Sequence, residues 1–467
     1  MITQKEISEI LASYDASDIT IGVLGGHSAL DVCEGAKKLG FKTLAVCKNG
    51  RDKTYSKYYK TQEDGTGCVD EVVLVDEFAD VLKEEVQEDL RARNTIFIHN
   101  RYFWVYFDFK DIEEKFQVPI YGARELVKLE ERDQPNNQYV LLEKAGIRIP
   151  KIVRTGEENL SADETKARLD EHFGEGGGPL LVKVNEAIRG YERAFFILVD
   201  TDDYSTKGKA MIEKGLVNED DLAKAVIEEF IIGAQINFNY FYSNLTGELE
   251  LMGTDTRRQT SLDGFLRLDA QVQTSLLQSG YKPSMIETGH IACTTKESIL
   301  EKAFTAGEKF IEMLEKEASE GRIAAGMIGP FALQGAIASY EGREEFVVFD
   351  VSMRIPGSPG TRFTPATTYK YGLFIILLSI ICVMLGTLFF FSLQALEGGF
   401  AATIIWTIIY CPVWIWSAIF SSNPSESIAT AVSSSETSWW VKLTTIPELQ
   451  VFTNTAESTS WAWWIYV

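Results

Sequence analysis

Short apolar runs alternate with helical repeats along the first 120 residues of the chain. Apolar runs of strand length predict strands at Ile19–Leu24, Phe41–Cys47, Val72–Asp76 and Thr95–His99. The spacing between them predicts helices at Ala29–Leu39, which ends at Gly40, and at Phe78–Ala92. Strands that alternate with helices favour a parallel sheet with both faces covered, and such sheets bind ligands at the carboxyl ends of their strands.

A second region, residues 121–372, mixes strands with helices. The periodicity predicts helices at Asn137–Ala145 and Lys296–Glu317. Strands are predicted at Leu180–Val184, Ile227–Gly233, Ile236–Tyr242, Leu249–Gly253, Gly329–Gln334 and Phe346–Arg354. We expect the glycine-rich stretch 174–178 to be a flexible connection and His290, which follows Gly289, to lie in a turn.

The last region, residues 373–467, differs chemically from the rest. Residues 373–396 and 400–420 are almost wholly apolar, and each is long enough to span a bilayer as a helix. Eight of the nine tryptophans follow residue 400, and Lys442 is the single basic residue after Lys370. Two interpretations stay open: a membrane anchor that makes contact through residues 373–420, or a frameshifted or chimeric end.

The bulk composition narrows the classes of partner and compartment. A net charge of −22 argues against a nucleic-acid partner, because binding a phosphate backbone needs a basic face. The six cysteines form neither a CxxC pair nor a zinc spacing. We therefore expect reduced, buried cysteines and a cytoplasmic protein, with membrane association only if the tail is a genuine anchor.

A glycine turn follows the first predicted strand, where residues 24–31 are LGGHSALD. Gly25 and Gly26 allow the backbone to approach a ligand, and the next helix points its amide groups at the same place. His27 adds a side chain that can donate a hydrogen bond or move a proton. The turn is a candidate phosphate site, although it matches neither GxGxxG nor the Walker pattern. A tight turn without a ligand is the alternative.

A lysine, two acids and two oxygen ligands recur later along the chain. Lys183 is a candidate to meet nucleotide phosphates, and Glu228 and Glu229 are candidates to hold an adenosine. Gln334 and Asp350 offer oxygens, the ligands that Mg²⁺ takes when it bridges to substrate phosphates. Taken singly, each feature has a plain alternative: a solvated lysine, an acid pair that alternates across a strand, and polar strand ends.

Together these features resemble an ATP-grasp ligase, and the ordered motifs are similar to an archaeal family, the formate-dependent 5-aminoimidazole-4-carboxamide ribonucleotide (AICAR) formyl ligases, or FAICAR synthetases. The resemblance covers about residue 17 to residue 372. The motifs that carry it are GGHSAL at 25–30, EKAGI at 143–147, EEF at 228–230, NYFYS at 239–243, MGTDTRR at 252–258, KESIL at 296–300 and GPF at 329–331.

The resemblance implies an α/β fold in two domains: a pre-ATP-grasp substrate domain over residues 1–120 and an ATP-grasp domain over 121–372, with a lid at about 150–232. It implies ATP and Mg²⁺ (or Mn²⁺) as cofactors and formate and AICAR as substrates. ATP would phosphorylate formate, and the amine of AICAR would attack the formyl phosphate, late in purine biosynthesis. It also implies a homo-oligomer.

The resemblance also implies roles for individual residues. Its catalytic residues would be His27 and Arg354. Its substrate-binding residues would be His27, Ser28, Tyr102, Asp255, Arg257, Arg258 and Ser261. Its ATP-binding residues would be Lys183, Glu228, Glu229, Phe230 and Ile231, and its metal ligands would be Gln334 and Asp350.

Three departures from the family pattern keep alternatives open. Residues 100–102 are Asn-Arg-Tyr where the family commonly has His-Gly-Ser, Asp350 replaces a glutamate, and the run at 354–360 resembles a paralogous branch. One alternative is therefore an ATP-grasp ligase that joins another small carboxylate to another amine. The other is a non-catalytic nucleotide-binding protein at a membrane; the oxygens kept at Gln334 and Asp350 favour an enzyme.

Overall fold

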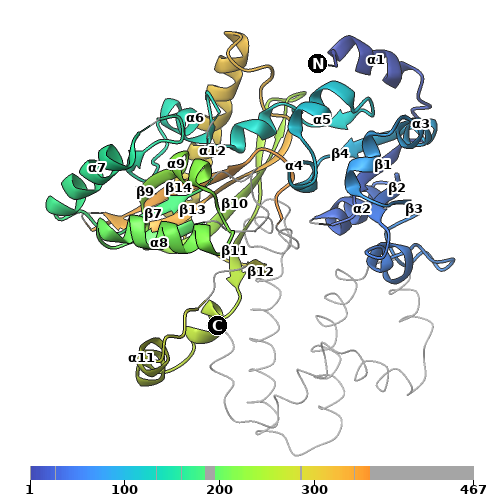
Figure 1. Ribbon diagram of the computed structural model, residues 1–467. Helices are drawn as coiled ribbons and strands as arrows, with labels where there is room; N and C mark the ends of the chain where they lie inside the picture. Colours follow the sequence, from blue (N-terminus) through green and yellow to red (C-terminus); the bar gives the residue numbers. More distant parts are fainter. Residues whose placement is uncertain are drawn as a thin grey trace, which may run out of the picture. The chain divides into compact units, whose positions relative to one another are not determined.

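The computed structural model describes residues 2–357, except residues 27, 133, 159, 185–194, 284–286 and 341. The chain divides into two units, residues 1–371 and 372–467, and the second lies wholly outside the described residues. The described residues of the first unit form three sheets, whose strands are labelled in Figure 1.

The first sheet is parallel and has five strands. It contains β1 (Thr20–Leu24), β2 (Lys42–Lys48), β3 (Glu71–Val75), β4 (Thr95–Ile98) and β5 (Ile120–Tyr121), in the order β3-β2-β1-β4-β5. Neighbouring strand residues point to opposite faces, so Val23 and Leu24 enter two different apolar cores. Both faces are covered, as the sequence predicts, and the chain order reverses between β1 and β4, where such sheets bind ligands.

Short helices precede β1 and connect the strands that follow it. They are α1 (Gln4–Ala12), α2 (Ala29–Lys38), η1 (Thr54–Tyr58), η2 (Phe78–Leu82), α3 (Glu84–Ala92), α4 (Tyr102–Val105) and α5 (Phe109–Lys115). The predicted helix Phe78–Ala92 is therefore wrong, because extended backbone at Lys83 divides it into η2 and α3. The Asp80 carboxylate accepts a hydrogen bond from the Glu77 amide, and such local bonds favour a short turn over a continuous helix.

The second sheet, called the small sheet below, is antiparallel. It contains β6 (Ile152–Arg154), β9 (Val226–Glu229), β7 (Leu180–Lys183) and β8 (Phe195–Leu198) in that order, with α7 (Ala162–Gly174), α8 (Asp202–Glu213) and α9 (Glu219–Ala223) beside it. The predicted strand Ile227–Gly233 ends at Glu229. The next residues cross to the third sheet, and a Cβ at Gly233 would lie 2.5 Å from the Ile337 carbonyl oxygen. This close approach of two backbones explains the glycine.

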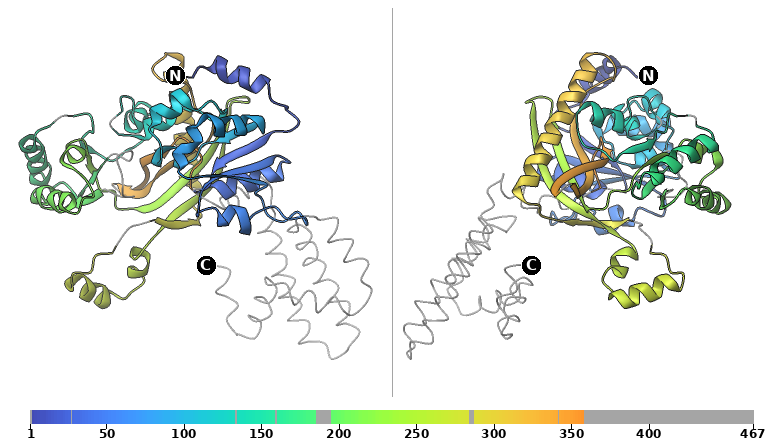
Figure 2. Two further views of the ribbon diagram at one scale, coloured as in Figure 1. Left: turned by 45° about the vertical axis from the view of Figure 1, so that its right-hand side comes forward. Right: turned by 90° about the vertical axis from the view of Figure 1, so that its left-hand side faces the viewer.

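The third sheet, called the large sheet, is also antiparallel. It contains β12 (Glu287–Ala292), β11 (Glu248–Gln259), β10 (Ala234–Ser243), β13 (Gly329–Tyr340) and β14 (Arg343–Ser352) in that order. Its other elements are η3 (Leu126–Glu130), α6 (Gln138–Lys144), α10 (Leu262–Phe265), α11 (Ala270–Gln278) and α12 (Glu297–Ser319). The helix predicted at Lys296–Glu317 is confirmed as α12, which lies along the sheet in Figures 1 and 2.

The two faces of the large sheet differ in polarity. Phe238 and Leu333 are opposite one another and belong to the apolar core that α12 covers with Phe310 and Leu314. The neighbouring residues along the same strands are polar. Asn237 is opposite both Gln334 and Asp255, and Gln334 is opposite Asp350. Residues directly opposite in a sheet share a face, so these four side chains leave the large sheet on the side away from α12.

The predicted parallel α/β domain is confirmed for the described residues, and two antiparallel sheets with their helices follow it along the chain. Cys33, Cys47 and Cys68 are buried free thiols, Cys293 is partly buried and free, and Cys382 and Cys411 lie outside the described residues. No helix within the described part of the chain has the length and hydropathy needed to cross a membrane. The apolar segments 373–396 and 400–420 lie outside that part.

Candidate active site

The loops that follow β1 and β4 contact each other at the carboxyl edge of the parallel sheet. The Asn100 side chain donates to the carbonyls of Leu24 (3.0 Å) and Gly26 (3.3 Å). The ring of Tyr102 packs so closely that a Cβ at Gly26 would lie 2.1 Å from it. The two loops therefore form one surface at the reversal point of the sheet. His27, the predicted catalytic residue of this surface, lies outside the described residues.

Ser28 joins this surface to the segment that follows β14. It precedes α2 with a positive φ of 68°, and its hydroxyl donates to the Pro356 carbonyl at 2.6 Å. Arg51, which the sequence analysis missed, lies on the loop after β2 and donates to the Tyr106 hydroxyl at 3.3 Å. Arg51 thus adds a cation near the edge where the loops after β1 and β4 meet. A basic residue just after a strand of a parallel sheet was the signal that could have found it.

A buried network surrounds Lys183 at the end of β7. The Lys183 ammonium lies 2.6 Å from a Glu228 oxygen and donates to the Tyr139 hydroxyl and the Phe349 carbonyl, both at 3.0 Å. Burial lowers the pKa of Lys183, and the Glu228 carboxylate opposes that shift. This network joins the small sheet to α6 and β14. Tyr139 is a site residue that the sequence analysis missed, since a tyrosine on an amphipathic helix gives no such signal.

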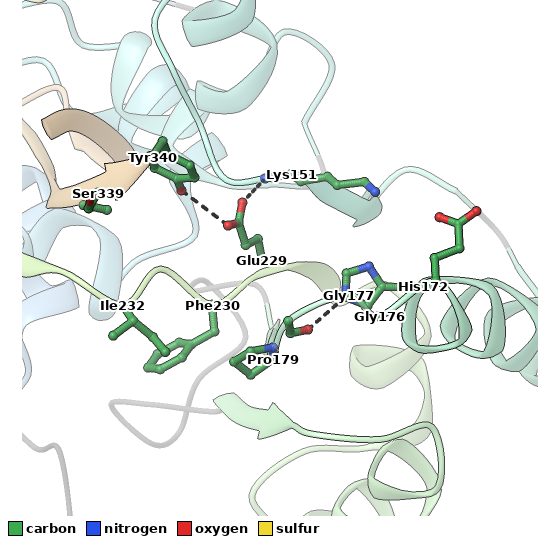
Figure 3. A pocket seen from close by; sticks show the side chains of 13 residues that line it. Lys151, His172, Gly176, Gly177, Pro179, Glu229, Phe230, Ile232, Ser339 and Tyr340 are labelled. Carbon is green, nitrogen blue, oxygen red and sulfur yellow. Dashed lines mark hydrogen bonds between the residues drawn. The ribbon is translucent and has the colours of Figure 1, made fainter. Parts of the chain in front are cut away.

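Glu229 points away from Glu228, as neighbouring residues of a strand must. Its carboxylate accepts from the Tyr340 hydroxyl and from the Lys151 amide, both at 3.3 Å (Figure 3). The two carboxylates therefore have different partners. Glu228 pairs with Lys183, whereas Glu229 connects the segment before β6 to the end of β13.

A cavity of about 470 Å³ opens beside Glu229 (Figure 3). The residues that line it are Lys151, His172, Glu175, Gly176, Gly177, Gly178, Pro179, Glu229, Phe230, Ile232, Ala338, Ser339 and Tyr340. The glycine-rich stretch is thus a wall of this cavity, and His172 contacts the Gly178 carbonyl at 2.9 Å. Of the predicted ATP-binding residues, Glu229 and Phe230 line the cavity, and Ile231 is a half-buried neighbour.

The predicted metal ligands share the polar face of the large sheet. Asp350 forms an ion pair with Arg132 at 2.9 Å. The Gln334 side-chain oxygen accepts from Arg257 at 2.5 Å, and its amide nitrogen donates to the Ser352 hydroxyl at 2.8 Å. Within the described residues no group of three or more His, Cys, Asp and Glu side chains could hold a metal by itself. One carboxylate and one amide oxygen still fit Mg²⁺ that takes its other ligands from water and phosphates.

Arg354 follows these residues along the chain, two positions after Ser352. Its guanidinium lies 3.2 Å from a Glu130 oxygen, and both side chains are buried. Two residues later, Pro356 accepts the hydrogen bond from Ser28. The segment after β14 therefore leads from the polar face of the large sheet directly to the loop after β1.

The predicted substrate residues of β11 divide between the two faces of the strand. Arg257 lies with Gln334, whereas Arg258 lies 3.7 Å from Asp263 on the other side. Ser261 precedes α10 with a positive φ of 54°. Asp255 is buried and accepts from Asn237 (2.8 Å) and Asn239 (2.6 Å). The four residues thus do not converge on one point.

His290 lies beside Asp255, and its side chain is 6% exposed, which corrects the turn expected for it. It lies in β12, and its Nδ1 contacts an Asp255 oxygen at 2.5 Å. Its Nε2 contacts a Glu287 oxygen at 3.1 Å. Burial by itself lowers the pKa of His290, but the hydrogen bonds to the two carboxylates outweigh burial and raise the pKa to about 9.

Comparisons with known proteins show the family of this chain. A sequence family described as "Protein of unknown function (DUF1246)" matches residues 21–153, and one described as "Domain of unknown function (DUF1297)" matches residues 203–380. A Methanopyrus kandleri protein named "5-formaminoimidazole-4-carboxamide-1-(beta)-D-ribofuranosyl 5'-monophosphate synthetase" is 34% identical over 372 residues, which are 80% of this chain and 92% of that protein. The chain belongs to this synthetase family.

Other members and a solved structure extend the comparison. A synthetase of the same name from Methanothermobacter thermautotrophicus is 34% identical over 371 residues, with 79% of this chain and 91% of that protein covered. The crystal structure of an IMP biosynthesis protein PurP from Thermococcus kodakaraensis is 23% identical with a TM-score of 0.49, and covers 75% of this chain and 90% of that one. The family inferred from the sequence motifs is therefore confirmed.

Proposed function

We propose that this member of the synthetase family catalyses the ATP- and formate-dependent formylation of AICAR to FAICAR, the reaction that provides a precursor of IMP in purine biosynthesis. The observation that carries the proposal is the path of the chain after Asp350. That residue, Ser352 and Arg354 follow one another from the polar face of the large sheet, and Pro356 contacts Ser28 in the substrate loop. Six residues span at most about 20 Å, so both half-reactions can share one site.

ATP would lie between the small and large sheets. The cavity beside Glu229 and Phe230 suits the nucleoside end, and Lys183, whose donors now go to Glu228, Tyr139 and Phe349, would turn to the phosphates. Gln334 and Asp350 would hold Mg²⁺ or Mn²⁺, which would neutralise phosphate charge when bound. Arg257 and Arg132 already contact these two residues and would add positive charge beside the same phosphates.

The chemistry then needs two transfers. A formate oxygen attacks the γ-phosphorus of ATP, the bond to the ADP oxygen breaks, and formyl phosphate forms. The amine of AICAR attacks the formyl carbon, phosphate leaves, and the nitrogen loses a proton. Arg354, buried between Ser352 and the substrate loop, would stabilise the negative charge of the departing phosphate, and His27 would orient the amine. Water must be excluded, because it would hydrolyse formyl phosphate.

AICAR would bind on the surface formed by the loops after β1 and β4. Gly25 and Gly26 allow a close approach, Ser28 and Tyr102 offer hydroxyls, and α2 begins at this point. One observation favours a second candidate. The Tyr102 ring fills the space beside Gly26 where the family commonly places a small serine, so a paralogous ligase acting on another amine and another small carboxylate is the alternative.

The test is release of ADP by the full chain with ATP, Mg²⁺ and formate, with and without AICAR. The proposed function predicts formate-dependent ADP release that AICAR stimulates, together with FAICAR as the product. Stimulation by a different amine would favour the paralogous ligase. Nucleotide binding without ADP release would favour a non-catalytic protein.

We also infer a cytoplasmic protein, since ATP and the small substrates of the proposed reaction are cytoplasmic, and a homo-oligomer, which the resemblance to the family implies. Light scattering of the purified chain would measure the number of subunits. Fractionation of expressing cells would test whether residues 373–420 make membrane contact: the chain would sediment with membranes if they do, and a variant that ends at residue 372 would not.

A further inference from the structure

Four charged side chains contact one another in series along the polar face of the large sheet. They are Asp255, His290, Glu287 and Arg257, and the last of them reaches Gln334. His290 contacts Asp255 with Nδ1 and Glu287 with Nε2, at 2.5 and 3.1 Å. The other Glu287 oxygen lies 3.3 Å from Nε of Arg257. The Arg257 guanidinium in turn donates to the Gln334 side-chain oxygen. This series of contacts thus ends on Gln334, a residue proposed to bind the metal, although His290 itself does not contact Gln334.

The contacts define the charge of the imidazole. A carboxylate only accepts hydrogen bonds, and both ring nitrogens of His290 face carboxylate oxygens. Both nitrogens must therefore carry a proton, so the ring is an imidazolium. The cluster of Asp255, His290, Glu287 and Arg257 is then electrically balanced, with two negative and two positive groups.

The backbone explains why this arrangement is rigid. In the ladder between β11 and β12, Arg257 is directly opposite His290, and Glu287 is opposite Gln259. Asp255 is held from the other side by Asn237 and Asn239 of β10. The His290 side chain is only 6% exposed. The imidazolium therefore bridges two carboxylates that would otherwise repel each other within the sheet.

We propose that His290 is a positioning residue of the nucleotide site: its imidazolium joins Asp255 to Glu287 and thereby keeps the Arg257 guanidinium against the Gln334 side-chain oxygen. The inference rests on the proposed function for the identity of the ligand, a metal–ATP complex. Without the positive ring, Glu287 would compete with the phosphates for Arg257, and the Gln334 oxygen would lose its orientation. Residues that orient a metal ligand typically change metal affinity about 10–100-fold when mutated.

The experiment measures equilibrium binding of Mg²⁺ and a non-hydrolysable ATP analogue to the full chain by calorimetry, so it requires no turnover. The variants are His290→Gln, which removes the charge, and His290→Lys, which restores a positive charge between the carboxylates. Ile291→Val, at an exposed neighbouring position of β12, is the matched control. Thermal unfolding of each variant reports whether the large sheet is intact.

We expect His290→Gln to weaken binding about 10–100-fold, His290→Lys to recover most of that loss, and Ile291→Val to bind like the unmodified chain. Equal binding by His290→Gln and the unmodified chain, or equal losses in the Gln and Lys variants with both folded, would overturn the inference. If His290→Gln does not fold, a folded His290→Lys that binds weakly overturns it, and one that binds normally supports it.

The result separates this inference from the proposed function. A chain that binds Mg²⁺ and the analogue in a His290-dependent way, yet releases no ADP with formate and AICAR, would contradict the proposed reaction and leave the role of His290 supported. If the chain formylates AICAR and His290→Gln leaves its nucleotide binding unchanged, the proposed reaction is supported and the role of His290 is contradicted. Failure of the unmodified chain to bind the analogue at all would overturn both.

Discussion

Gly26→Ala should damage amine binding while leaving nucleotide binding intact. A Cβ at Gly26 would lie 2.1 Å from one Tyr102 ring carbon, 2.2 Å from the next and 2.4 Å from the hydroxyl oxygen. Ordinary van der Waals contact begins at 3.4 Å, so the ring must retreat by about 1.3 Å. The Tyr102 amide is held by the Asn100 side chain at 3.1 Å, which limits that movement.

The expected magnitude follows from the cost of overpacking. Forcing an extra methyl group into a packed contact typically costs about 1–3 kcal/mol. If that cost falls on the conformation that binds the amine, it corresponds to a rise of about 5–150-fold in the KM for AICAR. The KM for ATP should change little, because the proposed nucleotide residues belong to the small and large sheets.

The assay is steady-state ADP release at varied AICAR and then at varied ATP. If the methyl group acts by displacing the ring, Gly26→Ala should have little further effect on the KM for AICAR in a chain that already carries Tyr102→Ala. Gly35→Ala, within α2 and with open space around its Cβ position, is the control and should behave like the unmodified chain. An unchanged KM for AICAR in Gly26→Ala would refute the placement of the amine on this loop. Equal loss of ATP affinity would refute the separate placement of AICAR at the parallel sheet and of ATP at the small and large sheets.

The other predictions concern the nucleotide network, acid stability and the connection between the sheets. Tyr139→Phe removes the hydroxyl that contacts Glu228 and should raise the KM for ATP, measured by ADP release, because the loss of a hydrogen bond to a charged group costs about 1.5–3 kcal/mol. Hydrogen bonds from Arg322 and Lys144 lower the pKa of Glu317 from 4.5 to about 2. A carboxyl with a lowered pKa stabilises the fold above its unfolded pKa and loses that contribution as pH falls through the folded value. Stability, measured by denaturant unfolding, should therefore fall between pH 4.5 and about 2, and Glu317→Gln should flatten this dependence. Gly233→Ala places a Cβ 2.5 Å from the Ile337 carbonyl oxygen and should lower the melting temperature and weaken ATP binding, measured by thermal unfolding and calorimetry.

Specific results would contradict each of these predictions. Unchanged ATP kinetics in Tyr139→Phe would mean that the hydroxyl does not support Lys183. An acid unfolding profile shared by Glu317→Gln and the unmodified chain would remove Glu317 as a source of the pH dependence. For Gly233→Ala the control is Gly264→Ala, whose Cβ position is open. Equal effects of the two alanine substitutions would show that the close approach to β13 has no consequence.

Local pattern was enough to predict the parallel domain and the longest helix. Strand-length apolar runs that alternate with helices allow few arrangements besides a parallel sheet, and β1 to β4 lie within one residue of the predicted strands. The periodicity of α12 extends over 23 residues, so one apolar stripe had to face a core. The glycine turn before α2 was also readable, because two adjacent glycines after a strand signal a close approach of backbone.

Contacts between distant segments could not be read in this way. Strand alternation places Glu228 and Glu229 on opposite sides, but only the pairing of β7 with β9 decided that Glu228 meets Lys183. The same holds for Arg132, which reaches Asp350 across 218 positions of the chain. An isolated arginine has no periodicity that reveals its partner.

His290 shows the physical reason most clearly. After a glycine, a histidine is locally indistinguishable from a turn residue, because its preference depends on neighbours that the linear sequence does not specify. In the folded chain, β12 pairs with β11 and places the imidazole between Asp255 and Glu287. Sequence periodicity determined which segments became strands and helices; only the pairing of strands from distant parts of the chain decided which charges meet, and charges that meet out of water define the site.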